Sequence, residues 1–86
     1  MDGNIEKTLE ERGNNYGSFW THSQIAQMLK NSMKATEGWD KLENDQKEAL
    51  EMIAHKIARI LNGNPNHKDS WHDIAGYAIL IDKRRK

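Results

Sequence analysis

The only proline of the chain, Pro65, is the feature that most constrains how it folds. It follows Gly63 in a short polar segment, residues 62–68, between two stretches whose apolar residues recur at helical spacing. Glycine just past a helix and proline soon after it are typical of a helix C-terminus. A loop this short joins two helices as an antiparallel hairpin. The sequence therefore predicts a C-terminal hairpin of helices over about 45–61 and about 69–83.

The first half of the chain predicts two more helices, over about 5–12 and about 19–35. The turn-forming cluster Gly13–Asn15 should end the first helix, and Ser18 can begin the second. Trp39 and Leu42 are expected to fold back onto the core from a loop. No strand-like alternation occurs, so we expect one all-α domain over residues 1–86, with four helices.

Composition indicates the oligomeric state, the kind of partner and the location of the protein. With 86 residues and no cysteine, the chain can bury only a small core and has no disulfide to reinforce it, so we expect a homo-oligomer. Its 13 basic and 13 acidic residues balance, which argues against a nucleic-acid-binding protein; the basic run at 83–86 suits a solvated helix end. No stretch is apolar enough to span a membrane and no signal peptide is recognisable, so we expect a cytoplasmic protein.

One face of the helix over 45–61 is polar. Glu48, Glu51, His55 and Arg59 follow one another at intervals of three or four residues, and Lys56 lies at the flank. Such a stripe is either a solvated face with weak ion pairs or part of a functional site.

The next helix begins with a second polar group. Asp69 and Asp73 share a face, with His72 beside them. Each acid has an ordinary explanation, Asp69 as an N-cap and Asp73 as a first-turn acid. Gly76, one turn further on, costs about 1 kcal/mol relative to alanine in a helix, and we expect another helix or a ligand to approach it closely.

Carboxylates on neighbouring helices can bind Mg²⁺, which bridges phosphate oxygens and activates water for attack on phosphorus. The acidic candidates are Glu48, Glu51, Asp69 and Asp73, and Arg12, Lys56 and Arg59 could neutralise a phosphate chain. Zinc fits less well, because His67 and His72 match no zinc spacing. Neither a phosphate-binding glycine loop nor a serine nucleophile elbow is present.

Three segments carry a family resemblance: Arg12-Gly13-Asn14-Asn15-Tyr16-Gly17, residues 48–60, and Asp69 through Ala78. They resemble a family of small phage and prophage proteins and are similar to phage nucleotide-modification-associated domains. More distantly, the chain resembles the all-helical MazG-like nucleotide pyrophosphohydrolases.

The MazG-like pattern, Glu-Glu-x-x-Glu followed by Glu-x-x-Asp, implies Mg²⁺-binding acids. Glu48, Glu51 and Asp73 match it, whereas Lys47 and Ser70 stand where the pattern has acids, and Asp69 is one residue out of frame. The resemblance implies metal binding and catalysis by the three matching acids, with Asp69 as an extra ligand. Tyr16, or Trp71, would stack on a base, and Arg12, His55, Lys56 and Arg59 would complete the substrate site.

The sequence thus predicts a phage-type, MazG-like protein of a bacterial host that binds nucleoside triphosphates with Mg²⁺. The incomplete acidic motif leaves open whether it also hydrolyses them to a monophosphate and pyrophosphate. The alternative is an accessory protein that binds a host protein without catalysis, through Trp20 or Trp39.

Overall fold

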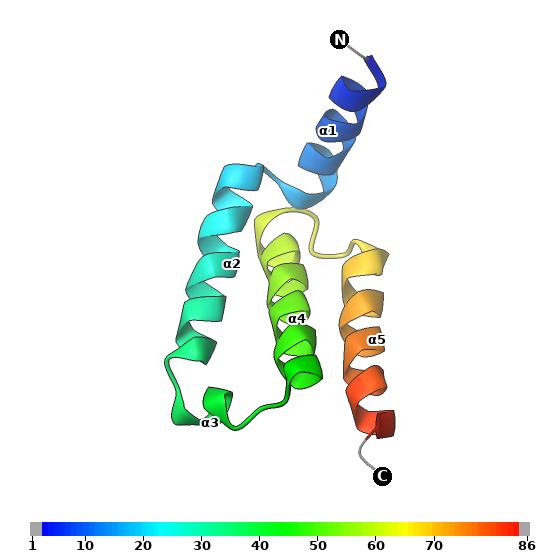
Figure 1. Ribbon diagram of the computed structural model, residues 1–86. Helices are drawn as coiled ribbons and strands as arrows, with labels where there is room; N and C mark the ends of the chain where they lie inside the picture. The colour runs from blue at the N-terminus through cyan, green and yellow to red at the C-terminus, as the bar shows by residue number, and fades with distance from the viewer. Residues whose placement is uncertain (1–2, 85–86) are drawn as a thin grey trace.

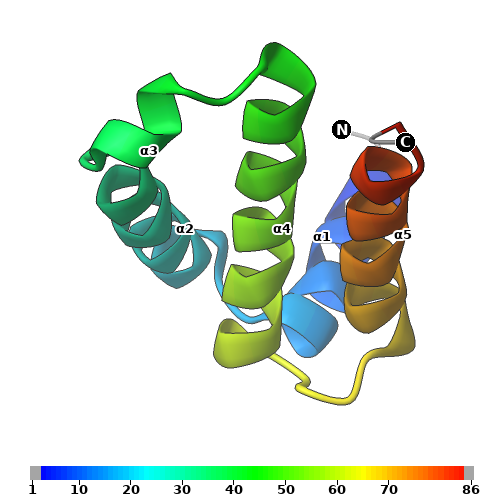
Figure 2. The ribbon, with the colours of Figure 1, turned by 90° about the horizontal axis from the view of Figure 1, so that it is seen from below.

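The computed structural model of the protein describes residues 3–84, apart from the side chains of residues 3 and 12–15. This range forms five helices and no strand: α1 (Gly3–Tyr16), α2 (Phe19–Lys34), α3 (Glu37–Asp40), α4 (Asn44–Asn62) and α5 (Lys68–Arg84). α4 lies between α2 and α5 and runs antiparallel to both, as the two views show (Figures 1 and 2). The predictions of an all-α fold and of a C-terminal hairpin are confirmed.

The boundary between α1 and α2 lies later than the sequence predicted. The backbone stays helical through Gly13–Asn15 and breaks at Gly17, whose φ of 78° lies in the left-handed region. A residue with a side chain adopts that conformation only under strain, so the glycine, rather than the asparagines, marks the turn. Ser18 caps α2 as predicted, since its hydroxyl accepts a hydrogen bond from the Thr21 amide at 3.2 Å.

The connection from α2 to α4 contains a one-turn helix where the sequence predicted a loop. Thr36 caps α3 by accepting a hydrogen bond from the Trp39 amide at 3.3 Å. Trp39 is buried, as predicted. α4 then begins at Asn44, one residue before the predicted start, with Glu43 as its N-cap. The Glu43 amide donates to the Gln46 side chain at 2.9 Å.

The core contains few large side chains. Its buried hydrophobic residues are Ala26, Trp39, Ala49, Ala54 and Ala58, and Ala58 has no exposed surface. Small residues let helix backbones approach closely, which is how α2 and α5 pack on opposite sides of α4.

Several large apolar side chains of the hairpin are exposed. Leu50 and Leu61 belong to the apolar residues that recur at helical spacing in α4, and Trp71 to those in α5, yet they are 37%, 66% and 56% exposed. A helix that packs on one neighbour usually buries a single stripe of leucine and isoleucine. α4 packs on two helices, and the residues it buries are alanines and Lys56. None of the described helices is long and apolar enough to cross a membrane.

Candidate functional site

The polar stripe of α4 faces α2 and the turn between α1 and α2. Glu51 pairs with Lys34 of α2 at 3.5 Å, and His55 contacts His22 of α2. One turn further on, the Arg59 guanidinium lies over the Tyr16 ring, 4.4 Å from its centroid. The stripe is therefore an internal polar seam, and the interpretation as a solvated face is wrong for its C-terminal half.

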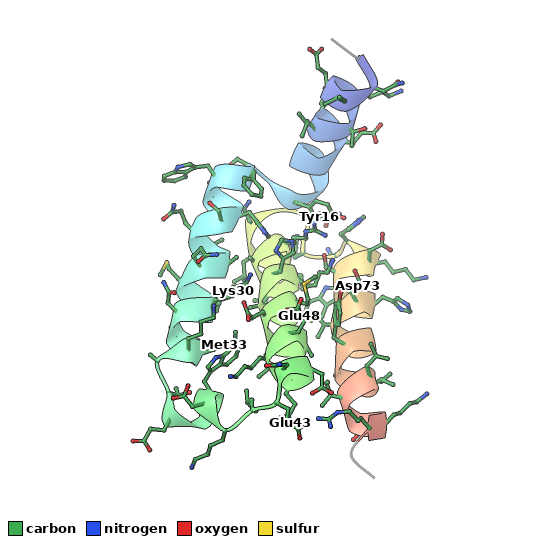
Figure 3. The ribbon with its side chains drawn as sticks, in the orientation of Figure 1. Tyr16, Lys30, Met33, Glu43, Glu48 and Asp73 are labelled. Carbon is green, nitrogen blue, oxygen red and sulfur yellow. The ribbon has the colours of Figure 1, made fainter. Side chains whose placement is uncertain are left out.

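A pocket of about 360 Å³ opens at the end of this seam. It lies where α1, the α1–α2 turn, α2 and α4 meet, at the end of the molecule where Figure 3 labels Tyr16. Its lining consists of Leu9, Tyr16, Gly17, Ser18, Phe19, His22, His55 and Arg59. The structure thus brings three predicted site residues, Tyr16, His55 and Arg59, to one cavity.

Asn62, the last residue of α4, fixes the turn that forms one wall of the pocket. Its side-chain amide donates to the carbonyl oxygens of Tyr16 at 2.8 Å and of Ser18 at 2.9 Å. A Cβ atom on Gly17 would overlap the Asn62 carbonyl oxygen, so the backbone of the turn packs directly on the end of α4. Two hydrogen bonds and this close approach make the wall rigid.

The two histidines of the pocket form a pair. His22 Nε2 and His55 Nδ1 lie 3.3 Å apart, and their rings meet edge to face. Burial and the nearby Arg59 lower the pKa of both imidazoles, that of His55 to about 4, with Lys30 as a further cationic neighbour of each ring. Both rings are therefore neutral at pH 7, and one donates to the other.

One ring nitrogen of His22 finds no partner among the side chains that the structure describes. The residue is 5% exposed, and within that part of the chain its buried Nδ1 atom makes no hydrogen bond. A buried polar atom without a partner is costly in a native protein. Whichever tautomer the pair adopts, this atom has unused hydrogen-bonding capacity, and a ligand group would reach it only after a neighbouring side chain moves, because the atom has almost no accessible surface.

The charges around the pocket favour an anion. Arg59 is its charged lining residue, and no acid belongs to the part of the lining that the structure describes. The N-terminus of α2, a 16-residue helix, also borders it and adds the positive pole of a helix dipole. Phe19 is 79% exposed and its ring stacks near His22, so it offers a free aromatic face beside this positive site.

Lys56 and Asp73 lie where α4 faces α5, at the flank of the polar stripe. The Lys56 ammonium, which is largely buried, contacts the Asp73 carboxylate of α5 at 3.0 Å. This hydrogen bond lowers the pKa of Asp73 below its usual value. The pair joins α4 to α5 and contributes nothing to the lining of the pocket.

The predicted metal ligands do not meet within one chain. Glu51 and Asp73 each have a lysine partner on a different side of α4, and Glu48 is exposed (Figure 3). Asp69 is exposed and lies 3.7 Å from His67. Among the side chains that the structure describes, no three of His, Asp or Glu gather closely enough to hold a metal ion. These acids do not fit a preformed Mg²⁺ site, and the side chain of Arg12 lies outside the described residues.

Sequence reasoning missed several pocket residues, His22 and Phe19 above all. His22 had a signal, because it continues the apolar stripe of Ile25, Ala26 and Leu29 at helical spacing, where a histidine must be buried. Asn62 and His67 were assigned to a polar loop, yet Asn62 holds the turn and His67 Nε2 lies 3.2 Å from the Tyr16 hydroxyl. Contacts between residues more than 40 positions apart leave no local pattern.

Comparison with known proteins gives one family. No curated protein and no solved structure matches the chain. The model of a family described as a domain of unknown function, DUF6378, matches residues 4–85, which span all five helices except the first residue of α1. The chain therefore belongs to the DUF6378 family.

Proposed function

We propose that this protein binds a nucleoside phosphate in the pocket between α1, α2 and α4. The observation that carries the proposal is the composition of that pocket: Arg59, the positive end of α2 and a buried histidine nitrogen without a partner, with an exposed aromatic ring at the rim. The phosphate groups would lie against Arg59 and the first turn of α2. The base would stack on Phe19, and a shift of the surrounding side chains would let it reach the buried Nδ1 atom of His22.

The pocket suits part of a nucleotide rather than a purely apolar ligand. Ligand sites are concave and largely apolar, with a few convergent polar groups that fix orientation. The volume of about 360 Å³ lies near the lower end for small-molecule sites, so part of a nucleoside triphosphate would extend into solvent. Leu9 and Phe19 supply the apolar walls of the pocket.

Hydrolysis is not part of this proposal. It would need the MazG-like acids, and Glu48, Glu51 and Asp73 do not converge in one chain. The phage-type MazG-like resemblance supports a nucleotide as the ligand class, and Mg²⁺ stays a prediction to be tested in the binding experiment. The alternative of a host-protein partner now concerns exposed Trp20, because Trp39 is buried.

Calorimetric titration with each of the four deoxynucleoside triphosphates, with and without Mg²⁺, tests the proposal. Arg59→Gln should weaken binding by about 10- to 100-fold, the value of a charge-assisted hydrogen bond to phosphate. Arg84→Gln is the matched control, because it removes the same charge at the far end of α4, where Arg84 pairs with Glu43. Equal effects of the two variants, or no binding of any triphosphate, would refute the proposed site.

A second readout locates the ligand. A bound phosphate would offset the positive charge of Arg59, one of the causes that lower the pKa of His55 to about 4. NMR titration of the histidine rings should therefore show the pKa of His55 rising when a triphosphate binds. An unchanged His55 with a bound nucleotide would place the ligand elsewhere.

A further inference from the structure

The protein exposes more surface than a compact chain of its mass. Its accessible surface is 6435 Å², whereas a compact monomer of 10.0 kDa should expose about 5,200 Å². Its radius of gyration is 14.9 Å, against about 12 Å expected for this length. The excess of roughly 1,200 Å² exceeds the share of about 800 Å² that each partner contributes to a stable protein–protein interface.

One end of the molecule projects from the rest. α1 projects beyond the ends of α2, α4 and α5 (Figure 1), which explains the longest dimension of 46 Å. One stripe of α1 is apolar and open: Ile5 is 52% exposed and Leu9, one turn later, is 63% exposed. An isolated helix of this length is marginal in water, so α1 needs a surface to pack on.

The start of α2 extends the same apolar surface. Phe19 and Trp20 are 79% and 72% exposed. Leu9 lines both the pocket that contains Phe19 and a hollow beside Ile5, so the apolar surface is continuous from α1 to Phe19, and Trp20 follows Phe19 in the first turn of α2. Contiguous exposed aromatic and aliphatic side chains are typical of a protein interface. We call the surface formed by Ile5, Leu9, Phe19 and Trp20 the α1–α2 face.

The charges of the two helices permit this contact. α1 carries Glu6, Glu10 and Glu11 against two basic residues, whereas the start of α2, over residues 19–29, carries no acid and begins at the positive pole of a helix dipole. Two copies related by a two-fold axis could therefore place the acidic helix α1 of each along the start of α2 of the other and bury apolar groups twice.

We propose that a second copy of this chain covers the α1–α2 face, forming a two-fold dimer in which α1 of each copy packs on the start of α2 of the other. The second copy would also border the pocket, because Leu9 and Phe19 belong both to the pocket wall and to the face. This inference needs no nucleotide, and its test is made without one. Because His22 lies against one face of the Phe19 ring, a base and a partner helix would compete for the other face, so a bound nucleotide should weaken the dimer.

The test is the mass of the full chain in solution, by analytical ultracentrifugation over a wide concentration range without nucleotide. The expected mass is twice the chain mass of 10.0 kDa. Leu9→Glu combined with Trp20→Glu should weaken self-association by at least about 100-fold, since two charges would enter an apolar interface. Circular dichroism checks that the variant keeps its helices.

Leu80→Glu is the matched control. Leu80 is 66% exposed on α5, close to the value for Leu9, and lies outside the α1–α2 face. It should leave the dimer intact. Three results would overturn the proposal: a monomer at every concentration, a dimer broken by Leu80→Glu but not by the α1–α2 variant, and a monomer that instead binds a different protein through Trp20.

If the α1–α2 variant fails to fold, a crosslinking experiment still decides. The chain has no cysteine, so Leu9→Cys and Trp20→Cys variants each carry one thiol. A mixture of the two should yield a heterodimer with a short bis-maleimide, whereas Leu80→Cys should yield none. If the sample has the mass of a dimer but no crosslinked heterodimer forms, the packing of α1 of one copy on α2 of the other is refuted.

Discussion

α4 meets its two neighbours in different ways. Toward α5 it presents Lys56, whose ammonium has a carboxylate partner in Asp73 at 3.0 Å. Toward α2 it presents His55 and Arg59, which line a pocket with His22 of α2. Among the described residues, the Nδ1 atom of His22 has no hydrogen-bond partner. An ion pair whose charges are both satisfied stabilises the fold. Polar groups that lack partners beside a cavity can instead contribute hydrogen bonds, and so binding free energy, to a ligand. The comparison separates the candidate site from the structural contact, although both come from the same polar stretch of sequence.

A substitution in the turn between α1 and α2, which Asn62 holds by two hydrogen bonds, should have the largest effect on stability. Gly17→Ala would place a side chain at φ 78° and against the Asn62 carbonyl oxygen. We expect the free energy of unfolding to fall by about 3 kcal/mol, since backbone strain adds to a steric clash. Urea denaturation followed by circular dichroism measures it. A loss below about 1 kcal/mol would mean that the turn is not rigid.

Breaking the ion pair on the α5 side should have a smaller and asymmetric effect. Asp73→Ala leaves the largely buried Lys56 ammonium without its partner, whereas Lys56→Met keeps the buried stem and leaves a carboxylate that water can reach. Lys56→Met should cost less than about 1 kcal/mol. Asp73→Ala should lower the melting temperature more than Lys56→Met does, and the reverse order would contradict the burial of the lysine.

The histidine pair should make stability depend on pH. Because the pKa of His55 falls from 6.5 to about 4 on folding and that of His22 also falls, the unfolded chain binds more protons than the folded one between these values. Stability should therefore be complete above about pH 6.5 and decrease as the pH drops toward 4. Urea midpoints measured across this range test it. His55→Gln should flatten the dependence, and His72→Gln, at an exposed position on α5, should keep it.

The smallest effect is expected at Gly76, on the outer side of α5. A Cβ atom there would meet no atom of the described residues within 4 Å, so the close approach expected at this glycine is not made within that part of the chain. Gly76→Ala should raise the free energy of unfolding by up to about 1 kcal/mol, the helix preference of alanine over glycine. Thermal melting should show a higher melting temperature for Gly76→Ala and a lower one for Gly17→Ala. Destabilisation by Gly76→Ala would indicate that another chain or a ligand approaches α5 closely.

Much of the fold could be predicted from local signals. Pro65 and Gly63 located the hairpin, and Ser18 located the start of α2, because caps and breakers act on their immediate neighbours. α1 was predicted too short because asparagines favour turns only weakly, whereas the glycine that requires the left-handed conformation comes afterwards. α3 is one turn long, too short to show periodicity.

The site was predictable only in part. Tyr16, His55 and Arg59 were named from their chemistry and do lie together. Glu48, Glu51 and Asp73 were named from a motif, yet spacing along a helix does not determine which neighbour each residue faces. His22, Phe19 and Asn62 reach the pocket through tertiary contacts, which a single sequence does not encode in any short window.

The alanines at the centre of the bundle limit how this sequence can change over time. At Ala58, which has no exposed surface, even one added methylene must push neighbouring helices apart, and truncation to glycine would loosen α4. Few substitutions that adapt the protein to a hotter or colder habitat can therefore occur in the core. They should occur on the outer surfaces of the helices, so divergent relatives should keep small residues along the bundle axis and differ at exposed positions.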